Sequence, residues 1–152
     1  MSSDEATSLS VHLRVRPLST KENANPDAAN IVRCSGDTIL VDATARQQDS
    51  TSKRYMGSRT AVPRAAKFQF RSVMGPRASQ ADVFDTVAQT VLGAFDGHNG
   101  AVLAYGATGS GKTYTMMGCD LSDEGVMPRA ADLLFKRKAE LESIGKAVSL
   151  EL

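Results

Sequence analysis

A short segment of this chain carries residue types that suit the binding of a multiply charged anion. The string AYGATGSGKTYTMMG, residues 104–118, places three glycines, a lysine and a closing threonine in the eight positions from Gly106 to Thr113. A phosphate chain must be surrounded by inward-pointing backbone N–H groups, and side chains on the loop would obstruct that approach. The segment matches the pattern GxxxxGK[ST], so its residues are the predicted phosphate cradle: Gly106, Ala107, Thr108, Gly109, Ser110, Gly111, Lys112 and Thr113.

The last two residues of the cradle supply the specific chemistry. The ammonium group of Lys112 can bind the β and γ phosphates, and the hydroxyl of Thr113 is placed to bind the Mg²⁺ that bridges them. A helix that starts at Lys112 would also direct its first amide groups at the same anion. The segment therefore predicts a site for a nucleoside triphosphate with Mg²⁺.

Such a loop needs a strand before it and a helix after it. The apolar run AVLAY, residues 101–105, does not alternate and predicts a strand buried on both faces of a parallel sheet. KTYTMMG predicts the start of a helix, and a further helix is expected from Pro128. Upstream, residues 79–95 have apolar positions at helical spacing, Ser79 and Asp82 resemble a capping box, and DGHNG suits the end of that helix.

The first half of the chain predicts strands. LSVHLRVR, residues 9–16, alternates between apolar and polar residues and is stopped by Pro17. TILVD near residue 40 and KFQFRSV, residues 67–73, are two further predicted strands. From Arg46 to Arg77 the sequence has eight basic residues and a single acidic one, Asp49. Residues 43–67 are therefore expected to be an exposed basic insertion, either a solvated loop or a contact for an acidic surface.

The overall composition indicates one globular domain. The chain has 152 residues, 41% of them hydrophobic and 23% charged, and its net charge is +1. This balance does not favour nucleic acid or a membrane surface as a partner. The start of the chain lacks a signal peptide, and no run of about 18 apolar residues is present. A cytoplasmic protein is expected.

Several strings, taken in order, resemble the amino-terminal half of a kinesin motor domain. They are RVRP in the first strand, SQADVF before the long helix, HNGAVLAYGATGSGKTYTMMG around the loop, and GVMPRAADLLF after it. The resemblance runs from about residue 11 to residue 152 and leaves residues 1–10 as a flexible N-terminus. Ala107 departs from the glutamine usual in kinesins, a change that a backbone cradle tolerates.

The resemblance also implies a pocket for the adenine base. Arg14, Arg16 and Pro17 match the kinesin residues beside the adenine and ribose, and His98 and Tyr114 would line the same pocket. Flat or apolar faces of these types suit a purine. Each position has an alternative interpretation from the residues alone: an exposed strand face for the arginines, a turn residue for His98, and a core or surface helix residue for Tyr114.

The implied fold is an α/β P-loop NTPase with three layers, α/β/α, and the implied function is that of an ATP-driven microtubule motor of the cytoskeleton. The kinesin strings NxxSSRSH and DLAGxE do not occur in the 152 residues. The chain is therefore expected to be a truncated piece with an incomplete central sheet, with bare edges on the strand before the loop, and without hydrolysis on its own. Subfamily, direction of movement, cargo and oligomeric state cannot be derived from these residues.

Two alternatives come from other classes of protein. A different P-loop enzyme, such as a small nucleotide kinase or ATPase, would need its own catalytic acid or arginine finger, and the sequence offers no candidate. A non-catalytic nucleotide-binding module would need only the cradle.

Overall fold

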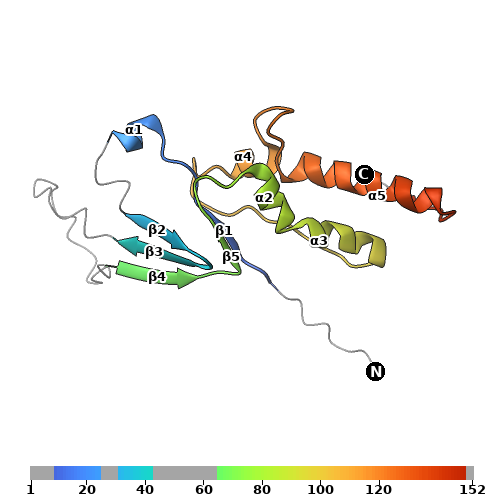
Figure 1. Cartoon of the computed structure of the whole chain (residues 1–152), viewed down its shortest axis with the longest axis horizontal. Helices are drawn as coiled ribbons and strands as arrows, with labels where there is room; N and C mark the ends of the chain where they lie inside the picture. Colours follow the sequence, from blue (N-terminus) through green and yellow to red (C-terminus); the bar gives the residue numbers. More distant parts are fainter. Residues whose placement is uncertain (1–8, 25–30, 43–64, 150–152) are drawn as a thin grey trace, which may run out of the picture. The chain divides into compact units, whose positions relative to one another are not determined.

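The computed structural model describes residues 9–24, 31–42 and 65–149, and Figure 1 shows its helices and strands. The chain divides into two units, Met1–Arg77 and Ala78–Leu152. Strands make up most of the regular structure in the first unit, and helices make up that of the second. Within the described residues, no helix combines the length and the apolar character needed to cross a lipid bilayer.

Two short parallel strands contain the predicted first strand of the chain. β1, His12–Arg14, pairs with β5, Ser72–Met74, and the amide of Val15 extends the ladder by donating to the carbonyl of Met74 at 2.8 Å. The predicted strand over residues 9–16 is thus correct in type but longer than the paired part. Leu9 is 84% exposed, so the apolar face of the predicted strand is not buried at its first residue.

The other strands of the first unit form an antiparallel sheet in the order β2–β3–β4. These strands are β2, Val32–Ser35, β3, Thr38–Asp42, and β4, Ala65–Gln69. The prediction of a strand at TILVD is confirmed by β3, which contains the buried Ile39. β2 was not predicted, although the two-residue connection Gly36–Asp37 between apolar runs is a hairpin signal.

The predicted single strand KFQFRSV is wrong, because this stretch belongs to two sheets. Phe70 and Arg71 separate β4 from β5. The amide of Phe70 donates to Asp37 at 2.9 Å, next to the antiparallel sheet, whereas that of Arg71 donates to Val11 at 2.9 Å, next to β1. Most of the predicted basic insertion, residues 43–64, lies outside the described residues, as do residues 1–8 of the predicted N-terminal tail. The insertion's last three residues, 65–67, belong to β4.

The second unit begins with the predicted helix over residues 79–95, which is interrupted. It consists of α2, Gln80–Asp85, α3, Ala88–Leu92, and η3, a 3-10 helix over Gly93–Asp96. The hydroxyl and the amide of Thr86 both donate to the carbonyl of Val83, at 2.7 and 3.2 Å. In a continuous helix, that carbonyl would accept from Val87, which donates to Phe84 instead. The helical ladder is therefore interrupted at Thr86, whose hydroxyl competes for the carbonyl of Val83.

The capping and termination signals of this helical segment are confirmed. The hydroxyl of Ser79 accepts from the amide of Asp82 at 3.1 Å, and the carboxylate of Asp82 accepts from the amide of Ser79 at 2.7 Å. The Asp82 carboxylate also accepts from the hydroxyl of Ser79 at 2.8 Å, and the bonds it accepts from the amide and the hydroxyl of Ser79 lower its pKa. At the other end, the helical segment stops at the DGHNG cluster, as predicted, and Gly97 ends η3 in the left-handed conformation.

The prediction of a buried strand over residues 101–105 is wrong for the described chain. Leu103 is 86% exposed and Tyr105 is fully exposed, and these residues have no strand partner within the described part of the chain. An apolar run becomes a buried strand only if neighbouring strands satisfy its backbone groups.

Two further helices complete the second unit. α4, Lys112–Met117, confirms the predicted helix after the glycine-rich loop. α5 spans Val126–Ser143, so it starts two residues before Pro128, which lies in its first turn. α5 packs against α2, α3 and α4, and the buried side chains of Val83 and Val126 belong to this packing. The predicted strand start VSLEL has no regular structure at Val148 and Ser149, and its last residues lie outside the described range.

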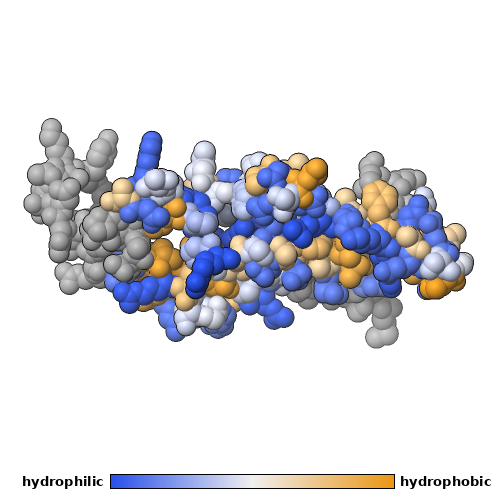
Figure 2. Space-filling model, turned by 45° about the horizontal axis from the view of Figure 1, so that its top comes forward, coloured by the Kyte–Doolittle hydropathy of each residue, from blue (hydrophilic) through white to orange (hydrophobic). Residues whose placement is uncertain are grey.

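Hydrophobic side chains also reach the surface. Figure 2 shows hydrophobic patches between hydrophilic ones on the visible face. Besides Leu103 and Tyr105, the exposed set includes Met127 and Phe135 of α5.

Candidate nucleotide-binding site

The loop from Gly106 to Gly111, called the P-loop below, turns back on itself and leads directly into α4. The amide of Ser110 donates to the carbonyl of Ala107 at 3.1 Å, which closes a turn in the middle of the loop. Gly111 is the N-cap of α4 and has a φ of 97°, a left-handed conformation that L side chains rarely adopt. A Cβ atom at Gly106 would lie 2.6 Å from the hydroxyl oxygen of Ser110. The loop therefore depends on its glycines, as a backbone cradle requires.

The side chain of Lys112 lies along the P-loop. Its Nζ donates to the carbonyl oxygens of Gly106 and Ala107, each at 2.9 Å. Two of the three N–H bonds of the ammonium group are used in this way. The single long cation of the motif is thereby held against the loop that precedes it.

Thr113 is the second residue of α4 and is exposed. Its hydroxyl is a hard oxygen ligand of the kind that Mg²⁺ prefers. Within residues 9–24, 31–42 and 65–149, no group of three or more His, Cys, Asp or Glu side chains could hold a metal ion. An ion bound through nucleotide phosphates and one hydroxyl needs no such group, so these residues fit Mg²⁺ that arrives with a triphosphate.

Tyr114 is anchored at both its main chain and its side chain. Its carbonyl accepts from the amide of Gly118 at 2.8 Å and from Nε2 of Gln80 at 2.8 Å. Its phenol hydroxyl donates to Asp123 at 2.5 Å, and the residue is 40% exposed. The structure thus gives the main chain and the phenol of Tyr114 hydrogen-bond partners within its own unit, and its predicted role beside the base stays a prediction.

Gln80, which donates to the Tyr114 carbonyl, is a residue that the sequence analysis did not single out. It is the first residue of α2 and is only 1% exposed, which makes it the most deeply buried polar residue among those described. Gln80 directly follows the capping residue Ser79 in the string SQADVF, and this position is the sequence signal that could have indicated it.

The other residues predicted for the base pocket lie in two different units. Arg14 is part of β1, and Arg16 and Pro17 follow it in the first unit. His98 belongs to the second unit, where it is exposed in the turn after η3 and its amide donates to Gly93 at 3.0 Å. The structure therefore brings Gly106–Tyr114 together as one loop and helix, and the base pocket remains a prediction.

Arg16 forms a bidentate ion pair with Glu22 of α1, Thr20–Asn23. The Nη1 and Nη2 atoms lie 2.8 and 2.6 Å from the two carboxylate oxygens, and Nη1 also donates to the carbonyl of Pro17 at 2.9 Å. The amide of Ser19 donates to the same carboxylate at 2.8 Å. The bonds from Arg16 and then from Ser19 lower the pKa of Glu22 from 4.5 to about 2, and the pair raises the pKa of Arg16.

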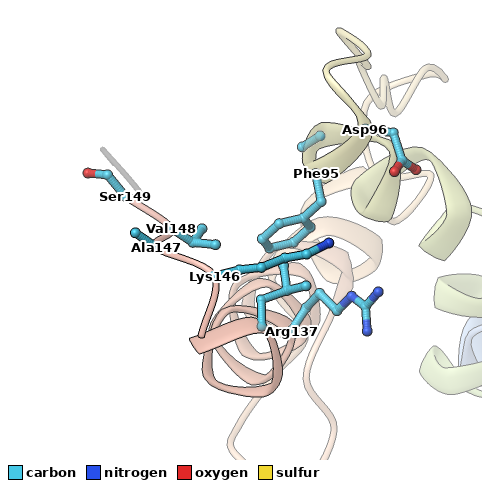
Figure 3. Close-up of a pocket in the computed structure, with 9 residues that line it drawn as sticks. Phe95, Asp96, Arg137, Lys146, Ala147, Val148 and Ser149 are labelled. Atoms are coloured by element: carbon cyan, nitrogen blue, oxygen red, sulfur yellow. The ribbon is translucent and has the colours of Figure 1, made fainter. Parts of the chain in front are cut away.

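A separate pocket of about 620 Å³ lies in the second unit between η3 and the end of α5 (Figure 3). Its lining includes Phe95, Arg137, Leu141 and Lys146. Arg137 is already paired with Glu140 at 2.9 Å. No residue predicted for nucleotide binding lines this pocket, so the candidate site is the P-loop.

Comparisons with known proteins agree with this assignment. The family model described as the kinesin motor domain matches residues 14–152. Kinesin-like protein K39 of Leishmania chagasi is 37% identical, and the match covers 93% of this chain and 16% of that protein. The protein claret segregational of Drosophila melanogaster is also 37% identical, with 93% of this chain and 19% of that protein covered. The chain thus spans less than a fifth of the length of these relatives.

Solved structures show the same fold. One is KIF14, residues 391–755, with ADP in complex with a microtubule: the TM-score is 0.67 at 29% identity, with 93% of this chain and 35% of that chain covered. Another is the motor domain of the Kar3-like kinesin from Ashbya gossypii, with a TM-score of 0.64 at 26% identity and coverage of 88% and 38%. The predicted α/β P-loop fold class is confirmed.

Proposed function

Because this chain belongs to the kinesin motor domain family, we propose that it is the ATP-binding part of a microtubule motor of the cytoskeleton. The full-length protein would couple ATP hydrolysis to movement along microtubules or to binding of them. The observation that carries the proposal is the position of Lys112, whose ammonium group lies against the P-loop at 2.9 Å from two of its carbonyls.

Different groups of the loop and of α4 bind different parts of the magnesium nucleotide. Backbone amides of Gly106–Gly111 surround the phosphate chain, Lys112 neutralises the β and γ phosphates, and Thr113 holds Mg²⁺. Mg²⁺ held by the Thr113 hydroxyl and the nucleotide would supply positive charge against the phosphates. Phosphate oxygens bear full charge and are stronger acceptors than carbonyls, so they will take over the ammonium donors of Lys112.

The base is expected to bind through the remaining predicted residues. Arg14, Arg16, Pro17, His98 and Tyr114 would present flat or apolar faces to adenine and ribose. The ion pair with Glu22 supports such a role for Arg16, because it fixes the guanidinium plane before any ligand arrives. Comparing the affinities for MgATP and for magnesium tripolyphosphate, in the unsubstituted protein and in Arg16→Ala, tests this assignment. A base or ribose contact predicts that the variant weakens only MgATP.

Turnover needs a group that orients the attacking water. The residues present in the 152-residue chain include no candidate for this task. We therefore expect the chain by itself to bind MgATP without hydrolysing it, and the full-length protein to hydrolyse it.

Tubulin is the proposed partner of the full-length protein. The basic tract that includes Lys53 and Arg54 would be at most an auxiliary contact with its acidic surface. Neutralising both residues should weaken microtubule binding at low salt and have less effect at high salt, because exposed charges are screened. Unchanged binding at low salt would remove the tract from the interface.

The test of the proposal is ATP hydrolysis by the full-length protein, measured with and without microtubules. Turnover that increases when microtubules are added is the expected result. Absence of both microtubule binding and stimulated turnover would contradict the proposed function.

A further inference from the structure

The helix that presents Lys112 and Thr113 is too short to be stable on its own. α4 has six residues, from Lys112 to Met117. Isolated helices shorter than about 12 residues are marginal in water, so their stability comes from contacts with other elements. The orientation of the two phosphate-site side chains therefore depends on what holds α4.

One anchor is Gln80 at the start of α2. Its Nε2 donates to the carbonyl of Tyr114 at 2.8 Å, and the side chain is almost completely buried. Figure 1 shows α2 beside α4 within the second unit. The Ser79–Asp82 capping box fixes the first turn of α2, so the position of Gln80 is itself well defined.

A second anchor is Asp123 in the loop between α4 and α5. Its carboxylate accepts from the phenol of Tyr114 at 2.5 Å. The loop that carries Asp123 is tightly structured, because Asp120 accepts from the amide and hydroxyl of Ser122 at 2.8 and 2.5 Å. A bridge between Gly118 and Glu124 closes the base of the loop.

The two anchors act on the same residue, which lies directly after Thr113. Gln80 holds the main chain of Tyr114, and Asp123 holds the end of its side chain. A rotation or shift of α4 would break one bond or the other, and it would move Lys112 and Thr113 relative to the P-loop. We propose that Gln80 and Asp123 are positioning residues that orient α4 for binding the phosphates of a magnesium nucleotide, an inference that rests on the proposed function.

Substitution at Gln80 can separate positioning from folding. Gln80→Met keeps the length and volume of the side chain but removes the donor. The Tyr114 carbonyl keeps its bond from the amide of Gly118, so it is not left unsatisfied. Gln89→Met is the matched control, since Gln89 is an exposed glutamine in the neighbouring helix α3.

A second pair of variants tests the other anchor. Asp123→Ala removes the acceptor of the Tyr114 phenol, whereas Asp123→Asn keeps an oxygen that can accept from it. The asparagine variant should therefore restore most of what the alanine variant loses. The main-chain bonds of Asp123 are retained in both variants.

The measurements are the affinity for MgATP and amide hydrogen exchange in the same protein samples. Loss of the hydrogen bond to Tyr114 predicts affinities about three- to tenfold weaker for Gln80→Met and Asp123→Ala. The amides of Thr115 and Gly118 in and after α4 should exchange faster, with those of α5 unchanged. Gln89→Met and Asp123→Asn should remain within about twofold of the unsubstituted protein.

Three results would overturn the inference. They are unchanged MgATP affinity in both anchor variants, unchanged exchange in α4, and an equal loss of protection in α4 and α5, which would indicate a general loss of stability. If the unsubstituted protein did not bind MgATP, the proposed function would fail, and hydrogen exchange in α4 would still decide whether Gln80 and Asp123 anchor it.

Discussion

The ammonium nitrogen of Lys112 lies 2.9 Å from the carbonyl oxygen of Gly106, six residues earlier in the chain. This bond joins the first residue of the P-loop to the first residue of α4. The cation that the motif requires is thus already close to the backbone that would surround the phosphates. To bind phosphate, the Lys112 ammonium group only has to exchange its carbonyl partners for phosphate oxygens.

The left-handed conformation of Gly111 predicts a specific intolerance to side chains. Gly111→Ala should lower the free energy of unfolding by about 1–2 kcal/mol, because an L residue is strained at a φ of 97°. It should also weaken MgATP binding, since the strain acts at the N-cap of α4. Urea unfolding and calorimetric titration measure the two effects.

Gly75→Ala is the matched control for this substitution. A Cβ atom at Gly75 would meet no atom within 4 Å, and its φ is not positive. Alanine there should leave both quantities unchanged or slightly raise stability. Equal losses of stability and of MgATP affinity in the two variants would show that the left-handed conformation of Gly111 is not their cause.

The close approach of Gly125 to Gly118 predicts a second site where only glycine fits. A Cβ atom at Gly125 would lie 2.6 Å from the amide nitrogen of Gly118 and 2.6 Å from the carbonyl of Met116, and backbone cannot move aside cheaply. Gly125→Ala should therefore cost about 1–3 kcal/mol of stability. Gly93→Ala, which creates only an ordinary contact at 3.5 Å, should cost nothing by thermal unfolding, and a similar loss there would refute the steric explanation.

The ion pair between Arg16 and Glu22 predicts a pH dependence at the acid end. The pKa of Glu22 in the folded protein, about 2, is lower than its ordinary value of 4.5. A carboxyl group with a lowered folded pKa contributes stability above its unfolded pKa, and this contribution is lost as the pH falls through the folded pKa. Stability should therefore decline between about pH 4.5 and pH 2 in part because Glu22 becomes protonated.

Replacing Arg16 tests this prediction directly. Arg16→Gln should move the titration of the Glu22 carboxyl, followed by NMR, toward higher pH, because the bonds from Arg16 are the largest cause of the shift. Arg137→Gln, which removes an exposed ion pair within α5, serves as the control and should leave that titration unchanged. A Glu22 titration that is the same in all three proteins would disprove the assigned cause.

Local signals in the sequence predicted the parts of the fold that depend on neighbouring residues. The capping box of Ser79 and Asp82, the helix end at the DGHNG cluster and the helix from Lys112 all arise from short-range chemistry and were predicted correctly. The glycine pattern of the P-loop belongs to the same class, because it requires only backbone space and conformation.

Features that depend on distant partners were not predictable in this way. The apolar segment 101–105 has the pattern of a buried strand, yet burial requires strands beside it. The stretch around Phe70 and Arg71 reads as one strand, and only the pairing partners Asp37 and Val11 show that it changes sheets. Gln80 looks like an ordinary helix residue until its contact with Tyr114, 34 residues later, is known.

The break in the helical segment after α2 has a different origin. Periodicity of apolar residues predicted a continuous helix, because Val83, Val87 and Val91 keep their helical spacing. The spacing says nothing of the Thr86 hydroxyl, which competes for the carbonyl of Val83. A pattern that records only hydrophobicity therefore misses the interruption.

The most direct test of the account is calorimetric titration of MgATP into the protein and into its Lys112→Ala variant, with Lys136→Ala of α5 as the control lysine. Charge-assisted bonds to phosphate are each worth about 1.5–3 kcal/mol, so Lys112→Ala should weaken binding by roughly 10- to 100-fold. Lys136→Ala should bind like the unsubstituted protein. Equal MgATP affinity in the Lys112→Ala variant and the unsubstituted protein would contradict the claim that this loop binds the nucleotide.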